Sequence, residues 1–157
     1  MKKTAYEFPA ETAKEGLAAI TIPKLAAFIT KPSEYAPSKA PVFYNPVMKL
    51  NRDLAVLAFQ AHQRNINRPI SICEPLTGCG VRTVRLGLEV EGINKIVAGD
   101  INEKASKLAS HNMQLNKLDK LITVKHSDAN KLLSSYSAPR KRFDIIDIDS
   151  FGSPRSE

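Results

Sequence analysis

The stretch EPLTGCG, residues 74–80, decides the fold, because it joins an apolar run to a segment with helical spacing. The run before it, residues 69–73, is rich in isoleucine and is typical of a buried strand. The segment after it predicts a helix that begins near Val81. Glycine adopts turn conformations closed to other residues and lets the backbone approach a ligand closely. The stretch therefore predicts a strand, a turn and a helix. The glycines of the turn either only allow the chain to change direction or also bring its backbone close to a ligand.

Short β-branched runs continue to alternate with helical stretches as far as residue 148. Four strands are predicted, at Pro69–Cys73, Lys95–Gly99, Leu121–Lys125 and Phe143–Ile148. Runs that are apolar on both faces and joined by helices indicate a parallel sheet covered on both sides. The predicted fold class is therefore α/β, a Rossmann-like doubly wound sheet.

A proline-rich segment and one long helix precede this alternation. The five prolines before Tyr44 exclude long regular elements, and the best strand among them is Ala18–Pro23. Either Asn51 or Asp53 can cap a helix that runs to about residue 64. Apolar residues of this helix recur at helical spacing on one face: Leu54, Leu57, Ala58 and Ala61.

Length and composition bound the class of protein. A chain of 157 residues can bury one modest core, so we expect one domain, residues 51–157, behind an N-terminal extension with short strands, residues 1–50. No apolar run approaches the roughly 20 residues of a membrane span, and the N-terminus lacks a secretory signal. The spacing of Cys73 and Cys79 does not match a zinc site. We therefore expect a cytoplasmic protein with no metal site and no membrane partner.

The net charge of +7 favours an anionic partner, because neutralising phosphates with Lys and Arg releases condensed counterions. Nucleic acid is the natural candidate. An excess of lysine also serves solubility, and no run of adjacent basic residues is longer than Arg140-Lys141-Arg142. Charge alone only slightly favours nucleic-acid binding.

Carboxylates follow every predicted strand of the sheet. They are Glu74, Asp100, Asp128 and the pair Asp147 and Asp149. Ligands in such sheets bind outside the carboxyl ends of the strands, so we expect these side chains to surround one site. Asp100, its neighbour Asn102 and Asp128 can equally cap the helices that follow.

The chemistry of these groups points to S-adenosylmethionine as the cofactor. A dinucleotide would require the fuller G-x-G-x-x-G spacing, which Gly78 and Gly80 followed by Thr83 do not supply. S-adenosylmethionine carries an ammonium, a sulfonium and a ribose diol, and carboxylates suit all three. We predict that Glu74 and Asp100 bind the cofactor, and that Asp128 lies beside the adenine ring.

The last strand is followed by DIDSFGSP, residues 147–154, where methyltransferases that act on exocyclic amines carry an acidic loop. An acceptor for the amine hydrogens turns the nitrogen lone pair toward the methyl group and can later receive a proton. Asp149 is the predicted acceptor. Phe151 can stack on an extruded base or belong to the core, and Asp147 can cap the turn.

These motifs together resemble the tRNA (guanine-26-N2)-dimethyltransferase family over almost the whole chain. The matching segments are Glu15-Gly16, Ile20-Thr21-Ile22-Pro23, Val42-Phe43-Tyr44-Asn45-Pro46, Asn51-Arg52-Asp53, Gly80-Val81-Arg82, Asp100-Ile101-Asn102, Asp128-Ala129-Asn130 and Asp149-Ser150-Phe151-Gly152-Ser153-Pro154. The resemblance implies methyl transfer from S-adenosylmethionine to the 2-amino group of a tRNA guanine, once or twice.

The same resemblance implies roles for individual residues. Those implied to hold the cofactor are Arg52, Arg82, Asp100, Asp128 and Ala129, and the one implied to meet the reacting amine is Asp149. From the residues alone, Arg52 and Arg82 would be surface residues of helices.

Two departures from the family shape the expectations. The family has proline where this chain has Ser150, and without the fixed φ of proline the acidic loop is less pre-set. Similar proteins also continue with further strands and a C-terminal domain that helps bind tRNA. We therefore expect an incomplete class I methyltransferase sheet, which is a fragment, a truncated gene product, or one part of a split protein whose sheet a second chain completes. The alternatives are an inactive remnant or subunit that binds cofactor or RNA, and a methyltransferase for another substrate such as DNA adenine.

Overall fold

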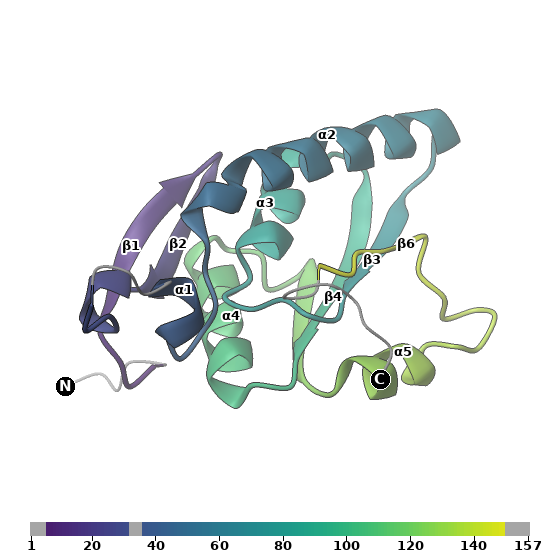
Figure 1. The fold of residues 1–157 in the computed structure, drawn as a ribbon. Coiled ribbons are helices and arrows are strands. Elements are labelled where there is room, and N and C mark those ends of the chain that lie inside the picture. The colour runs from purple at the N-terminus through teal and green to yellow at the C-terminus, as the bar shows by residue number, and fades with distance from the viewer. Residues whose placement is uncertain (1–5, 32–35, 150–157) are drawn as a thin grey trace.

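The structure, a computed structural model, describes residues 6–31 and 36–149, and Figure 1 shows how its elements are arranged. In chain order they are β1 (Ala10–Glu15), β2 (Ala18–Pro23), η1 (Leu25–Ala27), α1 (Ala36–Lys39), η2 (Pro46–Met48), α2 (Lys49–Ile66), β3 (Ile70–Glu74), α3 (Val81–Glu89), β4 (Ile93–Asp100), α4 (Glu103–Leu115), β5 (Ile122–His126), α5 (Ala129–Ser135) and β6 (Ile145–Ile146).

A parallel sheet with the strand order β5-β4-β3-β6 lies at the centre. The chain winds from β3 through β4 to β5 and then returns to the far side of β3, so the direction reverses at β3. The predicted doubly wound α/β sheet is confirmed, and α3 begins at Val81 as expected.

The last strand is shorter than predicted, because β6 contains only Ile145–Ile146. Backbone hydrogen bonds from Asp144 to Ser71 and from Asp147 to Cys73 extend its pairing with β3 by one residue on each side. Phe143 lies outside the strand, and its ring packs against Tyr136 at a centroid distance of 4.7 Å.

Helices cover both faces of the sheet. The main core lies on the face that carries α2, α3, α4 and the β1–β2 hairpin, and includes Ile20, Ile72, Leu86, Ile96 and Leu108. A smaller cluster of Cys73, Val97 and Leu132 lies beneath α5 on the other face. Among the residues that the structure describes, no helix is both long enough and apolar enough to cross a membrane.

The N-terminal hairpin packs on α4 (Figure 1) and belongs to the main core. The predicted strand Ala18–Pro23 is confirmed as β2, and its antiparallel partner β1 was not predicted. Buried Asn112 of α4 joins three segments: it accepts a hydrogen bond from Thr21 N at 2.8 Å and donates to the carbonyl oxygens of Thr21 and Cys79. The hairpin is thereby tied to the glycine loop. The boundary between residues 50 and 51 stays a prediction.

The long helix α2 differs from the sequence prediction at its start and in its orientation. It begins at Lys49, directly after η2, so Asn51 and Asp53 lie inside the helix and do not cap it. Asn45 accepts a hydrogen bond from Val47 N and caps η2 instead.

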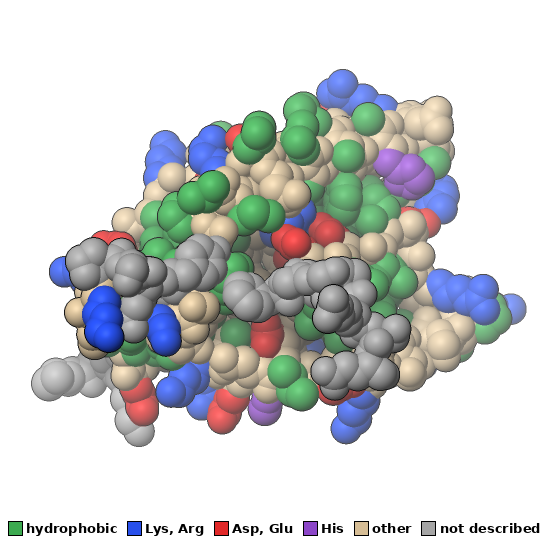
Figure 2. Space-filling model, viewed as in Figure 1, with side chains coloured by type: hydrophobic (Ala, Val, Ile, Leu, Met, Phe, Trp, Pro, Cys, Tyr) green, Lys and Arg blue, Asp and Glu red, His purple; other side chains and the backbone are tan. Residues whose placement is uncertain are grey.

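The predicted apolar face of α2 is exposed, with Leu54 57% and Leu57 66% accessible (green along the upper edge in Figure 2). Val56, Phe59 and Ile66 on the opposite face pack against the core. The helical period was correct, but period alone does not say which apolar stripe faces inward.

Candidate functional site

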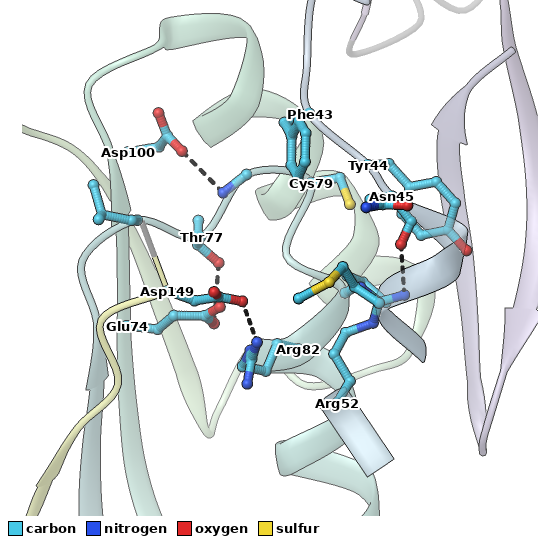
Figure 3. Close-up of a pocket in the computed structure, with 14 residues that line it drawn as sticks. Phe43, Tyr44, Asn45, Arg52, Glu74, Thr77, Cys79, Arg82, Asp100 and Asp149 are labelled. Atoms are coloured by element: carbon cyan, nitrogen blue, oxygen red, sulfur yellow. Dashed lines mark hydrogen bonds and ion pairs between the residues drawn. The ribbon is translucent and has the colours of Figure 1, made fainter. Parts of the chain in front are cut away.

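A pocket of about 400 Å³ lies where β3, β4 and β6 end. Its walls are formed by Phe43, Tyr44, Asn45, Met48, Arg52, Glu74, Leu76, Thr77, Gly78, Cys79, Val81, Arg82, Asp100 and Asp149. Figure 3 shows that these side chains converge from the glycine loop, from α2 and from the segment before it. The reversal of winding at β3 opens this crevice, as expected for a doubly wound sheet.

The glycine loop is fixed in place by backbone hydrogen bonds. Thr77 N donates to Gly99 O at 2.8 Å, and Gly78 N donates to Asp100 Oδ2 at 2.9 Å. Gly78 has a φ of +55°, which a side chain would strain, and it lines the pocket. Gly80 has a φ of +79° and does not line the pocket, because it faces Ala109 of α4.

Glu74 lies at the bottom of the pocket with its side chain buried. Thr83 and Thr77 both donate hydrogen bonds to Oε2. Burial raises the pKa of this carboxyl to about 8, more than the two threonines and the nearby Arg82 lower it. A buried acid of this kind is prepared to pair with a cation that enters the pocket.

Replacing Glu74 with glutamine is expected to change how stability depends on pH. Between its ordinary pKa of 4.5 and about 8, folded Glu74 keeps the proton that the unfolded chain has released. Raising the pH through this window therefore lowers the free energy of unfolding by about 1.4 kcal/mol per pH unit. Glutamine cannot lose a proton, so Glu74→Gln should resemble the parent near pH 5 and be more stable at pH 8.

Urea unfolding of both proteins at several pH values measures this difference. Glu91→Gln, at an exposed position, is the control and should follow the parent at every pH. Parallel pH profiles for Glu74→Gln and the parent would show that Glu74 is ionised in the fold.

Arg82 connects α3 with the segment after β6. It forms ion pairs with Asp149 and with Asp147, the latter at 3.5 Å, and donates to Asn51 Oδ1 at 2.7 Å. Arg82 is 7% exposed, so its description as a surface residue was wrong. Burial raises the pKa of Asp147. Among the described residues, its Oδ2 faces Arg82 Nη1 at 3.5 Å and accepts no hydrogen bond. Arg82 thus pairs with both acids that follow β6, and Figure 3 shows its contact with Asp149 in the pocket.

Arg52 is also buried, which corrects its description as a surface residue. Its Nε and Nη2 donate to the two oxygens of Glu15, each at 2.7 Å, and Nη2 also donates to Asn45 O. Arg85 contacts the same Glu15 at 3.1 Å and continues to Asp53 and Glu89. Arg52 therefore supports the pocket wall through an ion-pair cluster, and its predicted contact with a cofactor stays a prediction.

Asp100 and Asn102 divide the roles that the sequence left open. Asn102 caps α4 by accepting from Lys104 N at 2.9 Å. Asp100 accepts from Gly78 N and from Asn102 N, and it lines the pocket. Its carboxylate is therefore held against the glycine loop, at the edge of the pocket.

Asp128 and Ala129 lie outside the pocket lining. Asp128 is the N-cap of α5 and accepts from Lys131 N at 3.0 Å, and Ala129 is the first residue of that helix. The capping alternative thus describes Asp128 in this structure, and a contact of either residue with adenine stays a prediction. Ser150 and Phe151 lie outside the described residues.

The residues that the site analysis of the sequence missed come mainly from the segment before α2. Phe43, Tyr44 and Asn45 form one wall of the pocket, opposite Glu74 (Figure 3). The only signal in the sequence for this segment was that it belongs to the motifs shared with the family. Tyr44 donates to Glu15 Oε2 at 3.3 Å, and burial raises its pKa to about 12. The phenol therefore stays neutral and serves as a wall.

A family model, curated relatives and a solved structure all relate this chain to the same group of proteins. Residues 16–156 match the model of a family described as N2,N2-dimethylguanosine tRNA methyltransferase. The chain is 40% identical over 141 residues to the tRNA (guanine(26)-N(2))-dimethyltransferase of Methanosphaera stadtmanae, a match that covers 90% of this chain and 33% of that protein. It is 34% identical over 149 residues to the tRNA (guanine(26)-N(2)/guanine(27)-N(2))-dimethyltransferase of Aquifex aeolicus, covering 92% and 35%.

Among solved structures, the chain resembles Trm1 from Pyrococcus horikoshii in complex with S-adenosyl-L-methionine, with a TM-score of 0.73 and 31% identity. The match covers 92% of this chain and 37% of that one. The chain thus spans about a third of the length of the relatives that it matches.

Proposed function

The chain belongs to the N2,N2-dimethylguanosine tRNA methyltransferase family, and on this premise we propose that it forms the cofactor-binding part of a tRNA guanine-N2 methyltransferase. The observation that carries the proposal is the gathering of Glu74, Asp100 and Asp149, from three strand ends, around one pocket. The methyl donor is S-adenosylmethionine, and the acceptor is the exocyclic 2-amino group of a guanine in tRNA. The proposed place of action is the cytoplasm, where the buried thiols of Cys73 and Cys79 stay reduced.

The residues present fit this cofactor. Glu74 is a buried acid that forms no ion pair with any of the described residues, and the methionine ammonium would supply one. Gly78 leaves room for close approach of the ligand, and Asp100 offers its carboxylate to the ribose diol. Arg82 and Arg52 are the cations of the pocket and suit the methionine carboxylate. Further proposed cofactor contacts are Gly80, in the glycine loop, and Asp128 and Ala129, on the adenine side.

The chemistry then depends on the acids that follow β6. When bound, the cofactor supplies an electrophilic methyl group on sulfur. Asp149 accepts a hydrogen bond from the 2-amino group, which directs the nitrogen lone pair at that methyl. As the nitrogen–carbon bond forms and the sulfur–carbon bond breaks, Asp149 receives the proton that the amine loses. Arg82 holds this carboxylate in place, and Phe151 is proposed to stack on the extruded base.

A second polypeptide that completes the sheet is part of the proposal. Within the described residues, six of the ten exposed large hydrophobic side chains lie on the η2–α2 segment or at the end of β6: Val47, Leu50, Leu54, Leu57, Ile146 and Ile148. In the sheet formed by the described residues β6 is an edge strand, and unpaired edges invite further pairing. Since the relatives are about three times longer, the remaining part of such a protein is the proposed source of the covering segments.

One experiment tests the function and the second polypeptide together. The chain is incubated with unmodified tRNA and cofactor labelled on its methyl group, either alone or with a polypeptide spanning the remaining part of the Methanosphaera relative. Label on guanine N2 supports the function, and label that requires the added polypeptide supports completion in trans. Cofactor binding without transfer in both arms would instead favour the inactive-subunit alternative, and label on another nucleoside would reject guanine.

A further inference from the structure

A second pocket, of about 620 Å³, lies apart from the first and shares no lining residue with it. It opens on the α5 side of the sheet, where Ser71, Lys95 and Phe143 mark the early part of β3, the early part of β4 and the approach to β6. Nothing in the proposed methyl transfer uses this pocket.

Half of the residues that line this pocket are basic, and none is acidic. The five cations are Lys95, Lys125, Arg140, Lys141 and Arg142. Within residues 6–31 and 36–149, none of the five forms a salt bridge. In Figure 2 some of the Lys and Arg side chains gather over the loop between α5 and β6, at the right-hand edge. Uncompensated charge of one sign in a concave site attracts an anion.

Two aromatic rings form the apolar part of the same pocket. Tyr136 and Phe143 pack against the core cluster under α5, so their rings are held from behind. Lys95 Nζ lies 4.9 Å from the centroid of Tyr136, and Lys125 Nζ lies 5.3 Å from the same centroid. Cations above a ring face are held by the ring quadrupole, so these two lysines are positioned rather than loose.

We propose that this basic pocket binds the phosphate backbone of RNA at a distance from the cofactor pocket. The identity of the anion as RNA rests on the proposed function. Five cations on two strands and one loop exceed what a single phosphate group needs, and they suit several consecutive phosphates. The ring of Tyr136 holds Lys95 and Lys125 side by side, so the pocket presents both charges to the same stretch of backbone.

The test neutralises the loop cations in the full chain. Arg140→Gln, Lys141→Gln and Arg142→Gln are combined in one variant, and Lys95→Gln with Lys125→Gln in another. Dissociation constants for a tRNA transcript are measured by fluorescence anisotropy between about 50 and 200 mM salt. Each phosphate that is no longer neutralised should reduce the slope of log K against log salt by about 0.7 to 0.9. We expect the triple variant to bind tRNA roughly tenfold or more weakly at about 50 mM salt.

A matched control separates this pocket from overall charge. Three exposed lysines line neither pocket: Lys14, Lys24 and Lys120. Replacing all three by glutamine lowers the net charge by three, as the triple loop variant does. Equal weakening in the control and the loop variant would overturn the proposal. Displacement of tRNA by inorganic phosphate at low concentration would also overturn it, in favour of a small-anion site.

The readouts distinguish this inference from the proposed function. Cofactor affinity, measured by calorimetry, should stay at the parent value in both pocket variants, which also shows that they are folded. Loss of tRNA binding in these variants supports the basic pocket even if the chain transfers no methyl group. Conversely, methyl transfer with unaltered tRNA binding in both variants would reject the pocket and leave the proposed function intact.

Discussion

Replacing Asp149 with asparagine is expected to slow methyl transfer to tRNA by about 10²- to 10⁴-fold, the range of a missing general base. Asparagine still accepts a hydrogen bond from the amine, but it cannot receive the proton. Asp149 lines the pocket proposed to hold the cofactor and pairs with Arg82, while its side chain remains 43% exposed and within reach of a substrate. Single-turnover rates at saturating cofactor measure the effect, under the conditions in which the parent chain transfers.

Asp147→Asn is the matched control for this prediction. Asp147 lies two residues earlier and contacts the same Arg82 at 3.5 Å, but it does not line the pocket. Its replacement should change the rate much less, and neither variant should lose cofactor affinity by calorimetry. If both variants slowed transfer equally, Asp149 would act through the charge around Arg82 and not at the amine.

The parts of the site that could be predicted from the sequence are those set by local pattern. Apolar runs of strand length placed β3, β4 and β5, and parallel winding then brought Glu74, Asp100 and Asp149 to one edge of the sheet. The tight turn after β3 could be predicted from Gly78 and Gly80, because few residues other than glycine tolerate the positive φ that both adopt. Fold class and the location of the pocket depend only on such rules.

Other features depend on contacts between distant segments and could not be predicted. Asp128 and Asp100 both follow strands and both precede helices, yet only Asp128 is an N-cap, because Asp100 is engaged by Gly78 N and Asn102 N. The helical spacing placed Leu54 and Leu57 on one face of α2. It could not show that a different apolar face of the same helix packs against the core. In both cases the deciding partner lies in another part of the fold.

The ion-pair cluster around Glu15 is the clearest case of this kind. It joins β1, α2 and α3 through Arg52 and Arg85, which are separated from Glu15 by 37 and 70 residues. Burial alone would raise the pKa of Glu15, but the hydrogen bonds and charges of the two arginines outweigh it and hold the pKa below its usual value. The carboxylate of Glu15 and the two arginines therefore stabilise one another's charged forms. Through Arg52, which lines the pocket, the cluster also fixes α2 to the N-terminal hairpin.

Replacing Glu15 with glutamine is expected to lower the free energy of unfolding by about 3 to 5 kcal/mol at pH 7, the usual effect of breaking a buried ion pair. Glu15 is 3% exposed and Arg52 is 5% exposed, so the variant leaves an arginine charge buried without its carboxylate. Urea unfolding followed by circular dichroism measures the change. Glu11→Gln, at an exposed position of the same strand, is the control and should change stability by less than about 0.5 kcal/mol.

The pH dependence of this effect provides an independent check. Because the pKa of folded Glu15 is lowered, its stabilising contribution is complete above the unfolded value of 4.5 and is lost as the pH falls through the folded value. The gap between the parent and Glu15→Gln should therefore be constant near neutral pH and narrow under acidic conditions. A gap that did not narrow in acid would mean that the loss arises from packing around the amide, and that Arg52 and Arg85 do not require the charge of Glu15.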